Sequence, residues 1–530
     1  MPTTADFIIE NAKIFTSDEK KPHAQALAVK GNRIIFVGTS EEAKEYKNSA
    51  TRVVDGQGRT VTPGFIDSHF HLLWGSISMG GAQLYDAKNL EDVKQVLQTF
   101  AAENRTSEWV DGRGVKYTII STRQELDAMV SDRPVYINAY DGHTSWANTK
   151  ALEIAGILQP GVEAPGVGTI VRDENGLATG ELRETAMGLV SDLIPEASDT
   201  RKRELLKMTI QKINATGVTS VHNMNGDMEE MMVYAALEDT GEMTLRVYVP
   251  YHIKPETTEE MVKKEAAEMA KVQGDFARGG AAKFFMDGVW ESYTALNVEP
   301  YADDLEAKPD GIYSLEHFTR MAELCDKMGL QIFVHCCGDG AVGRTLDGYE
   351  AVQRSNGKRD SRHRIEHIEV IHPDDIPRFN QLGVLPSMQT SHSPFSIKEG
   401  DVWPVRVGEK RWPLSFAWRD IKNAGNNIAF GSDWPVAPYD PMINLHVGMN
   451  REKWNLDNPD QTLTLEELII GYTRDAAYAE FKENEKGQIK EGYLADMVLF
   501  SHDLFALKPE DIMTAKPVMT VVDGKVVFEA

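Results

Sequence analysis

The chain has 530 residues, too many for one small hydrophobic core, so its length favours a barrel with insertions and a second, smaller domain. Its 56 Lys and Arg residues against 81 Asp and Glu residues give a formal net charge of −25, which is spread along the chain rather than gathered in a tail. Because an acidic surface repels phosphate backbones and anionic lipid, a nucleic-acid partner and a membrane-surface role are both disfavoured.

The cysteine content favours a reducing compartment. Cys325, Cys336 and Cys337 are the only cysteines, and two of them are adjacent, which is no basis for a disulfide framework. The first residues lack a basic segment followed by an apolar one, and no run approaches the about 20 apolar residues that a membrane span requires. We therefore expect a cytoplasmic protein that acts on a small molecule, and leave open whether it forms a homodimer.

Both ends of the chain show the pattern of short β-strands. Residues 7–38 contain three β-rich segments separated by turns, and residues 496–528 contain two more, the second a hairpin at an Asp-Gly turn. The two ends flank a long middle segment, in which strand-like runs alternate with helical stretches. We expect residues 1–60 and 485–530 to form one small β-sandwich domain together.

The middle of the chain, residues 61–484, alternates apolar strand-like runs with helical stretches such as residues 315–328 and 373–381. This alternation is typical of βα units around a parallel sheet. Eight runs predict a distorted TIM barrel, whose active site forms at the carboxyl ends of the strands. The runs cover residues 64–71, 218–222, 245–249, 282–286, 331–335, 364–367, 384–388 and 428–433.

One span does not fit a simple barrel. Residues 72–205, between the first and second runs, contain a strand-like segment at residues 134–140 and a probable hairpin at residues 169–179. Counting residues 134–140 as a barrel strand would give nine strands. We therefore assign the span to an inserted domain, acting as a lid or substrate domain.

The ends of the predicted strands carry residues of the types that bind metals in proteins. His69 and His71 are spaced i, i+2, which points both rings to the same side of a strand. His335, His367 and Asp433 close three other apolar runs, at the same predicted edge of the barrel. Four imidazoles and one carboxylate are the ligand set favoured by zinc and similar divalent ions.

Two of these positions have a simpler interpretation. Asp433 can be a helix N-cap, or it can bind the metal, take a proton from the metal-activated water and deliver it to the leaving amine. Lys283 can be a strand-end lysine that reaches solvent, or, after its amine reacts with carbon dioxide, an N6-carboxylated lysine that bridges two ions. The sequence leaves both alternatives open.

A second group of residues has weaker support. His143, in the insertion, is either a packed histidine or a donor to the substrate carbonyl oxygen. Glu184 and Arg364 are candidate substrate-binding residues, although surface positions or salt bridges explain them as well. Trp74 is either a pocket wall or a core residue, and His222 is best explained as a buried histidine that supports the site.

The assembly resembles the amidohydrolase superfamily, and more closely amidohydrolase family 3, the YtcJ-like group that includes N-substituted formamide deformylases. The resemblance covers essentially the whole chain. One local departure follows His335, where Cys336 and Cys337 replace an expected small Ala and make a sulfur ligand or an altered pocket an alternative. The motifs that carry the resemblance are Pro63-Gly-Phe-Ile-Asp-x-His-x-His71, Asp141-Gly-His-Thr-Ser-Trp-Ala-Asn-Thr-Lys-Ala-Leu152, Thr179-Gly-Glu-Leu-Arg-Glu184, Arg364-Ile-Glu-His367, Gly431-Ser-Asp-Trp-Pro-Val436 and Gly487-x-Ile-x-x-Gly-x-x-Ala-Asp496.

The resemblance implies hydrolysis by metal-activated water, with one or two ions. It implies metal ligands at His69, His71, His335, His367 and Asp433, with Lys283 as the carbamate bridge. We expect cleavage of a C–N bond in a small N-acyl or N-formyl amine. Two alternatives remain at this point: a metal-dependent ester, lactone or carbamate hydrolase or isomerase on the same scaffold, and a catalytically silent homologue.

Overall fold

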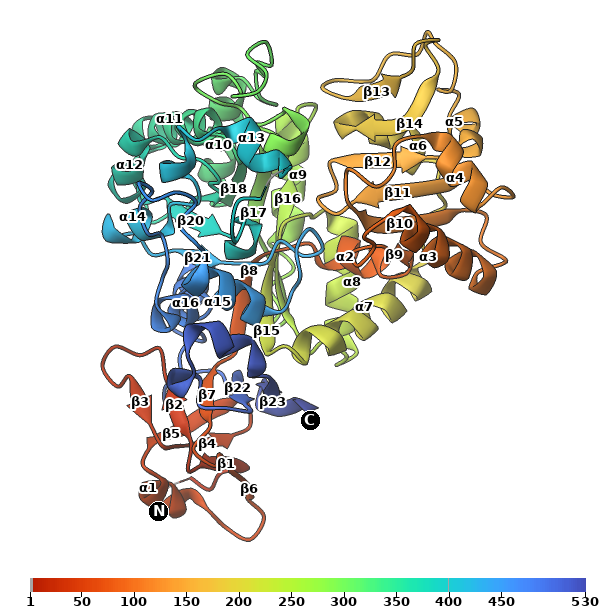
Figure 1. The fold of residues 1–530 in the computed structure, drawn as a ribbon. Coiled ribbons are helices and arrows are strands. Elements are labelled where there is room, and N and C mark those ends of the chain that lie inside the picture. Colours follow the sequence, from red (N-terminus) through yellow and green to blue (C-terminus); the bar gives the residue numbers. More distant parts are fainter. Residues whose placement is uncertain (1–2, 399) are drawn as a thin grey trace. The chain divides into compact units, whose positions relative to one another are not determined.

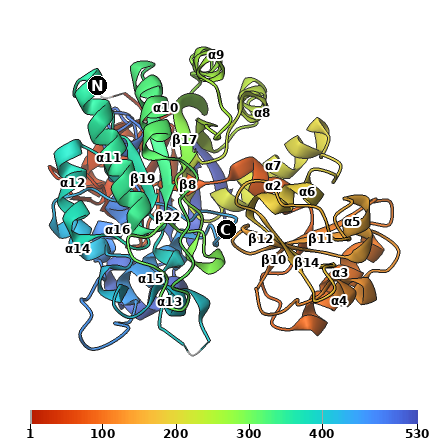
Figure 2. The same cartoon turned by 90° about the horizontal axis from the view of Figure 1, so that it is seen from above.

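The computed structural model describes residues 3–398 and 400–530. Figures 1 and 2 show the ribbon from two directions. The chain divides into two compact units. The first unit comprises Met1–His71, Lys207–Trp434 and Pro438–Ala530, and the second comprises Leu72–Leu206 and Pro435–Ala437.

The first unit contains the barrel predicted from the sequence. Its eight strands pair in parallel and in chain order, and each coincides with one of the eight predicted runs. The strand Gln331–Cys336 is buried at every position, as expected for a parallel strand covered on both faces. The strands are β8 (Phe65–Phe70), β15 (Val218–Asn223), β16 (Arg246–His252), β17 (Ala277–Phe285), β18 (Gln331–Cys336), β19 (Arg364–His367), β20 (Leu385–Met388) and β21 (Ala429–Phe430).

The barrel closes between β8 and the segment that follows β21. Phe70 forms a parallel bridge with Trp434, and the His71 amide donates to the Trp434 carbonyl at 2.8 Å. The Asp433 amide donates to the His69 carbonyl at 2.7 Å. The residues that close the barrel are therefore neighbours of, or identical with, the predicted metal ligands.

Helices follow most of the strands and surround the barrel (Figure 2). In α10, the Ser314 hydroxyl accepts a hydrogen bond from the His317 amide and starts the helix, and a buried stripe of Phe318, Met321 and Cys325 holds it in place. The predicted helix at 315–328 is thus confirmed. The helices of the barrel are α8 (Met228–Asp239), α9 (Glu259–Met269), α10 (Leu315–Lys327), α11 (Asp339–Asn356), α12 (Ile376–Leu382), α14 (Trp418–Asn423), α15 (Pro441–Asn450), α16 (Leu465–Gly471) and α17 (Arg474–Ala479).

Strands from both termini form two further sheets in the first unit. The N-terminal strand β7 pairs antiparallel with the C-terminal strand β22, and these two strands lie side by side in Figure 1. The two ends of the chain therefore share one six-stranded sheet. The other sheet has four N-terminal strands in the order β5-β4-β1-β6. The strands are β1 (Phe7–Glu10), β2 (Lys13–Phe15), β3 (His23–Ala24), β4 (Ala26–Lys30), β5 (Arg33–Gly38), β6 (Arg52–Asp55), β7 (Thr60–Pro63), β22 (Met497–Phe500), β23 (Pro517–Val522) and β24 (Lys525–Glu529).

The second unit contains a six-stranded sheet in the order β13-β14-β12-β11-β10-β9. Its strand Val135–Ala139 is the segment that would have been a ninth barrel strand, so its assignment outside the barrel is confirmed. The strands are β9 (Ala82–Gln83), β10 (Val110–Val115), β11 (Val135–Ala139), β12 (Thr144–Ala147), β13 (Thr169–Arg172) and β14 (Ala178–Arg183), with helices α2 (Leu72–Ser78), α3 (Leu90–Glu103), α4 (Arg123–Met129) and α5 (Thr149–Ile154).

Among the described residues, no helix combines the length and the apolar character needed to cross a bilayer. The cysteines Cys325, Cys336 and Cys337 are all buried as free thiols.

Candidate metal centre

Two segments at the barrel closure bring His69, His71 and Asp433 together. The Asp433 Oδ1 atom lies 3.0 Å from Nε2 of His71 and 3.3 Å from Nε2 of His69. The buried Asp67 contacts both segments, because its Oδ1 atom accepts hydrogen bonds from the amides of His69 and Ser432, at 3.2 and 2.9 Å. The same carboxylate thus fixes both segments, so the geometry is set by the backbone as well as by the side chains.

The approach of these two segments requires a glycine. A Cβ atom added to Gly431 would lie 2.4 Å from the His69 nitrogen and 2.8 Å from Asp67 Oδ1. This contact explains why the Gly-Ser-Asp sequence begins with a residue that has no side chain.

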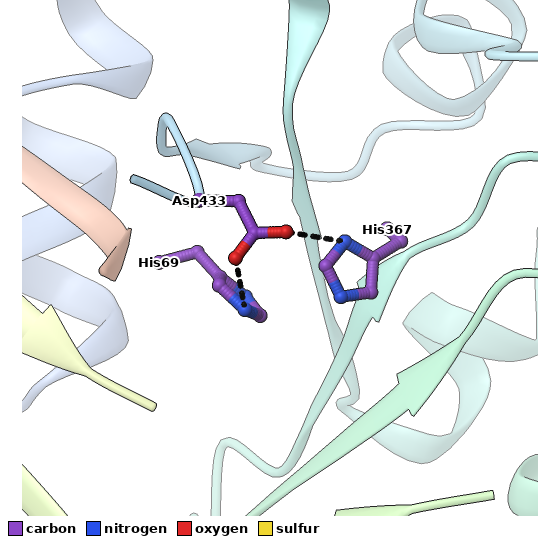
Figure 3. A group of neighbouring side chains, drawn as sticks. All are labelled: His69, His367 and Asp433. Carbon is purple, nitrogen blue, oxygen red and sulfur yellow. Dashed lines mark ion pairs between the residues drawn. The ribbon is translucent and has the colours of Figure 1, made fainter. Parts of the chain in front are cut away.

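Two further histidines lie at the other oxygen of Asp433. His367 Nδ1 is 3.9 Å and His392 Nε2 is 3.6 Å from Oδ2, and the two rings are parallel within 9° at a centroid distance of 5.7 Å. Figure 3 shows His69 and His367 on the two sides of the Asp433 carboxylate. One ligand atom from each of these three residues lies within 4.8 Å of the others. Asp433 is therefore surrounded by imidazoles, which is a suitable geometry for a divalent cation.

His392 is a residue that the sequence analysis missed. It lies in a short turn, Thr390–His392, just beyond β20, and its side chain is 12% exposed. The available signal was its position after the seventh barrel run, at the same edge as the other ligands. His392 follows Ser391 rather than an apolar residue, so it lacks the pattern of a histidine that closes an apolar run.

His335 and Lys283 are near the cluster but differ from their predicted roles in detail. The His335 ring lies 4.4 Å from that of His367, yet its Nε2 faces the Gly288 carbonyl at 3.1 Å and the Cys337 sulfur at 3.4 Å. Lys283 is fully buried, so the interpretation of a lysine reaching solvent is wrong. Among the described residues its Nζ has no hydrogen-bond partner, and it lies 4.8 Å from the centre of a phenylalanine ring.

The backbone at the cluster is strained. Asp433 and His367 have φ angles of +61° and +72°, in the left-handed region that residues with a side chain seldom adopt. Such a conformation costs about 1–3 kcal/mol for each residue and is typical of functional sites. The strain occurs at two residues whose side chains face each other.

The charges of the cluster suit a cation. Burial disfavours ionisation of Asp433, but the imidazoles of His69, His71 and His367 outweigh it and hold the pKa of the carboxyl well below its usual range. Burial, reinforced by neighbouring cationic groups, lowers the pKa of His69 and His367 well below the ordinary value, so both rings are neutral and keep a lone pair. Neutral imidazoles with one carboxylate are the donor set of zinc and similar ions, so the residues present fit such an ion.

The second unit contains the other predicted site residues, which form a group of their own. His143 Nδ1 lies 3.0 Å from Glu184 Oε2, and the Glu184 amide donates to the His143 carbonyl at 3.0 Å. Glu184 has a φ of +49°, again in the left-handed region. The Arg113 guanidinium stacks over Trp74 at 4.0 Å. Glu184 therefore orients the His143 ring, and Trp74 packs on an arginine of the same unit.

Arg364 is placed differently from its predicted role. It is fully buried in the barrel, donates hydrogen bonds to Glu366 and Ser387, and its Nη1 lies 2.8 Å from His222 Nδ1. Because its guanidinium is occupied by these partners, the structure favours a structural role over the predicted substrate contact. His222 is likewise fully buried and supports Arg364, as expected for a core histidine.

Parallel barrels with imidazoles and a carboxylate at the carboxyl edge are typical of hydrolases that use a metal. The model of the Amidohydrolase family matches residues 52–528 of this chain. The chain therefore belongs to the amidohydrolase family, and the family, its fold and the cluster together support a metal-dependent hydrolase of the amidohydrolase superfamily.

Relatives match along nearly the full length. The putative amidohydrolase YtcJ of Bacillus subtilis is 29% identical, with 97% of this chain and 98% of the relative covered. The N-substituted formamide deformylase of Arthrobacter pascens is 26% identical, with 100% and 99% covered. Among solved structures, an uncharacterized metal-dependent hydrolase from Pyrococcus horikoshii OT3 is 25% identical with a TM-score of 0.76, covering 95% of this chain and 99% of that one.

Proposed function

We propose that the protein hydrolyses a non-peptide C–N bond in a small N-acyl or N-formyl amine, using a divalent cation. The observation that carries this proposal is the ionised Asp433 carboxylate between neutral imidazoles at the carboxyl edge of the barrel. The choice of a C–N bond is supported by the formamide deformylase that matches the chain from end to end.

A divalent cation, when bound, acts as a Lewis acid and lowers the pKa of a coordinated water to near neutral. His69, His71, His335, His367 and Asp433 would hold it, with His392 close enough to assist. Zinc suits these donors best. An N6-carboxylated Lys283 would add anionic oxygen and allow a second ion. Burial lowers the pKa of Lys283 to about 8, which leaves part of the amine neutral, the form that reacts with carbon dioxide.

Asp433 would carry the proton. Its low pKa keeps it ionised at neutral pH, so it can accept a proton from the attacking water. Its left-handed backbone and the hydrogen bond from its amide to His69 hold it in one place during this transfer. The protonated carboxyl would then donate to the nitrogen of the leaving amine, which departs as a neutral molecule.

The His143 ring, oriented by Glu184, would donate a hydrogen bond to the substrate carbonyl oxygen as negative charge develops there. A Glu partner at Nδ1 is the arrangement that fixes which ring nitrogen carries a proton.

The test is Asp433→Asn, which keeps the shape of the side chain but removes its ability to accept the proton. We expect hydrolysis to fall by about 10²–10⁴-fold, as for loss of a general base, and by more than any loss of bound metal measured by elemental analysis. Asp374→Asn is the matched control, since that carboxylate is 90% exposed. Equal turnover in Asp433→Asn and the parent protein would refute the assigned role.

The substrate class is tested with a panel of N-formyl amines, N-acyl amino acids, esters and lactones, incubated with zinc-loaded protein. We expect release of amine from at least one of the first two classes. Cleavage confined to esters or lactones would refute the C–N assignment while leaving the metal centre intact.

A further inference from the structure

The interior of the barrel contains a continuous chain of buried polar side chains that begins at His69. His69 Nδ1 lies 2.8 Å from Glu366 Oε2, and the same oxygen accepts a hydrogen bond from Arg364 Nη2 at 3.1 Å. Arg364 Nη1 lies 2.8 Å from His222 Nδ1, and His222 Nε2 lies 3.2 Å from Glu480 Oε1. Each of these five side chains is at most 4% exposed. The chain links a predicted metal ligand to the interior of the barrel.

The far end of this chain is anchored by cations. Glu480 lies 2.6 Å from Lys486 Nζ and 3.1 Å from Arg278 Nη2, and Arg278 stands at the amino-terminal end of β17. Two pairs of an acidic and a basic side chain, Glu366 with Arg364 and Glu480 with Lys486, therefore lie along this chain. Such pairing compensates for the large cost of removing these groups from water.

The link between Glu366 and His69 determines the proton position on the His69 ring. Glu366 is fully buried beside the permanent positive charge of Arg364, with Arg364 Nε 2.9 Å from Glu366 Oε1. The Oε2 atom that faces His69 accepts a hydrogen bond from Arg364 Nη2, and a guanidinium has donors only, so Oε2 acts as an acceptor. The proton of the neutral His69 ring must therefore reside on Nδ1, and Nε2 retains its lone pair.

That lone pair faces Asp433. His69 Nε2 lies 3.3 Å from the Asp433 Oδ1 atom, so both atoms could act as donors to one divalent cation. Glu366 thus holds His69 in the one tautomer that makes Nε2 a ligand toward Asp433.

We propose that Glu366 is the positioning residue of the metal centre and that it sets the affinity for the divalent cation through His69. The proposal rests on the proposed function, because it takes His69 as a ligand. A carboxylate that accepts the other ring proton of a metal-binding histidine both orients the ring and makes it more basic. Arg364, for which a substrate contact was predicted, donates to Glu366 and so holds its carboxyl group against the His69 ring.

The experiment compares Glu366→Gln with Glu480→Gln. Both variants replace a buried carboxylate of the same chain of contacts by its amide, one beside the ligand and the other at the anchored end. Both are expected to destabilise the metal-free protein, because each leaves buried cations without their anion. We expect Glu366→Gln alone to weaken zinc binding, by about 10- to 100-fold.

Zinc affinity is measured by titrating metal-free protein in competition with a chromogenic chelator, and stability by urea unfolding of the same samples. If Glu366→Gln binds Zn²⁺ as tightly as the parent, or Glu480→Gln loses as much affinity, Glu366 is only structural and the proposal is wrong. If the parent protein itself binds no Zn²⁺, the metal centre fails, which is a different result. Should Glu366→Gln not fold, Glu366→Asp replaces it, with a smaller loss of affinity expected.

Discussion

The closure of the barrel at Gly431 offers a sharp test of how the site is built. In Gly431→Ala, the new Cβ would lie 2.4 Å from the His69 nitrogen and 2.9 Å from the His69 Cβ. Because ordinary contacts of this kind begin near 3.4 Å, the two segments must separate by about 1 Å. The Asp433 amide bonds to the His69 carbonyl two residues further on, so the separation is transmitted to the ligands.

Overpacking of this kind costs about 1–3 kcal/mol, and the displaced Asp433 carboxylate should also bind zinc less tightly. The assays are urea unfolding followed by tryptophan fluorescence, with and without Zn²⁺, and the competitive zinc titration. Gly343→Ala is the control: it lies in α11 of the same unit, where the added Cβ meets only a carboxylate oxygen at 3.2 Å. Unchanged stability and zinc affinity in Gly431→Ala would refute this reasoning, because the two closing segments would then accept the added Cβ atom without moving the ligands.

Two further predictions concern acid stability and the second unit. Burial lowers the pKa of His222 to about 4, below its value of about 6.5 in the unfolded chain. The folded state then binds fewer protons, so the stability is present above pH 6.5 and falls by up to about 3 kcal/mol as the pH drops toward 4. Urea midpoints across this range measure the slope, which should flatten in His222→Gln. For the second unit, we expect Glu184→Gln to lower kcat by about tenfold or more through loss of a charged hydrogen-bond partner of His143. Glu181→Gln on the same strand is the control, and equal kcat values would argue against the orienting role.

Most of the barrel was predictable because its strands are apolar runs, although residues 134–140 carry the same signal and belong to another sheet. Parallel strands covered on both faces are continuous apolar runs, as in Gln331–Cys336, and their polar last residues mark the carboxyl edge. The two sheets at the termini were expected as a single β-sandwich, and the antiparallel pairing of β7 with β22 confirms that both ends contribute. Both paired strands are buried at every position, and β22 is a continuous apolar run.

The candidate site was only partly predictable. His392 was missed because it lies in a turn rather than at the end of an apolar run. Arg364 begins β19 whereas His367 ends it, and three residues of a strand span about 10 Å, which separates the arginine from the ligand edge. The direction of His335 Nε2 toward Cys337 depends on a side-chain torsion, which local sequence does not encode.

The closure of the barrel, between β8 and the segment after β21, links metal binding to the stability of the fold. The predicted ligand His69 lies in the first barrel strand, and Asp433 follows the last one. Backbone hydrogen bonds join these two segments and close the barrel. An ion held by both residues would link the two segments across this closure, so that binding of the ion would also stabilise the closed barrel. Removal of that ion would then lower the stability of the folded barrel as well as its activity.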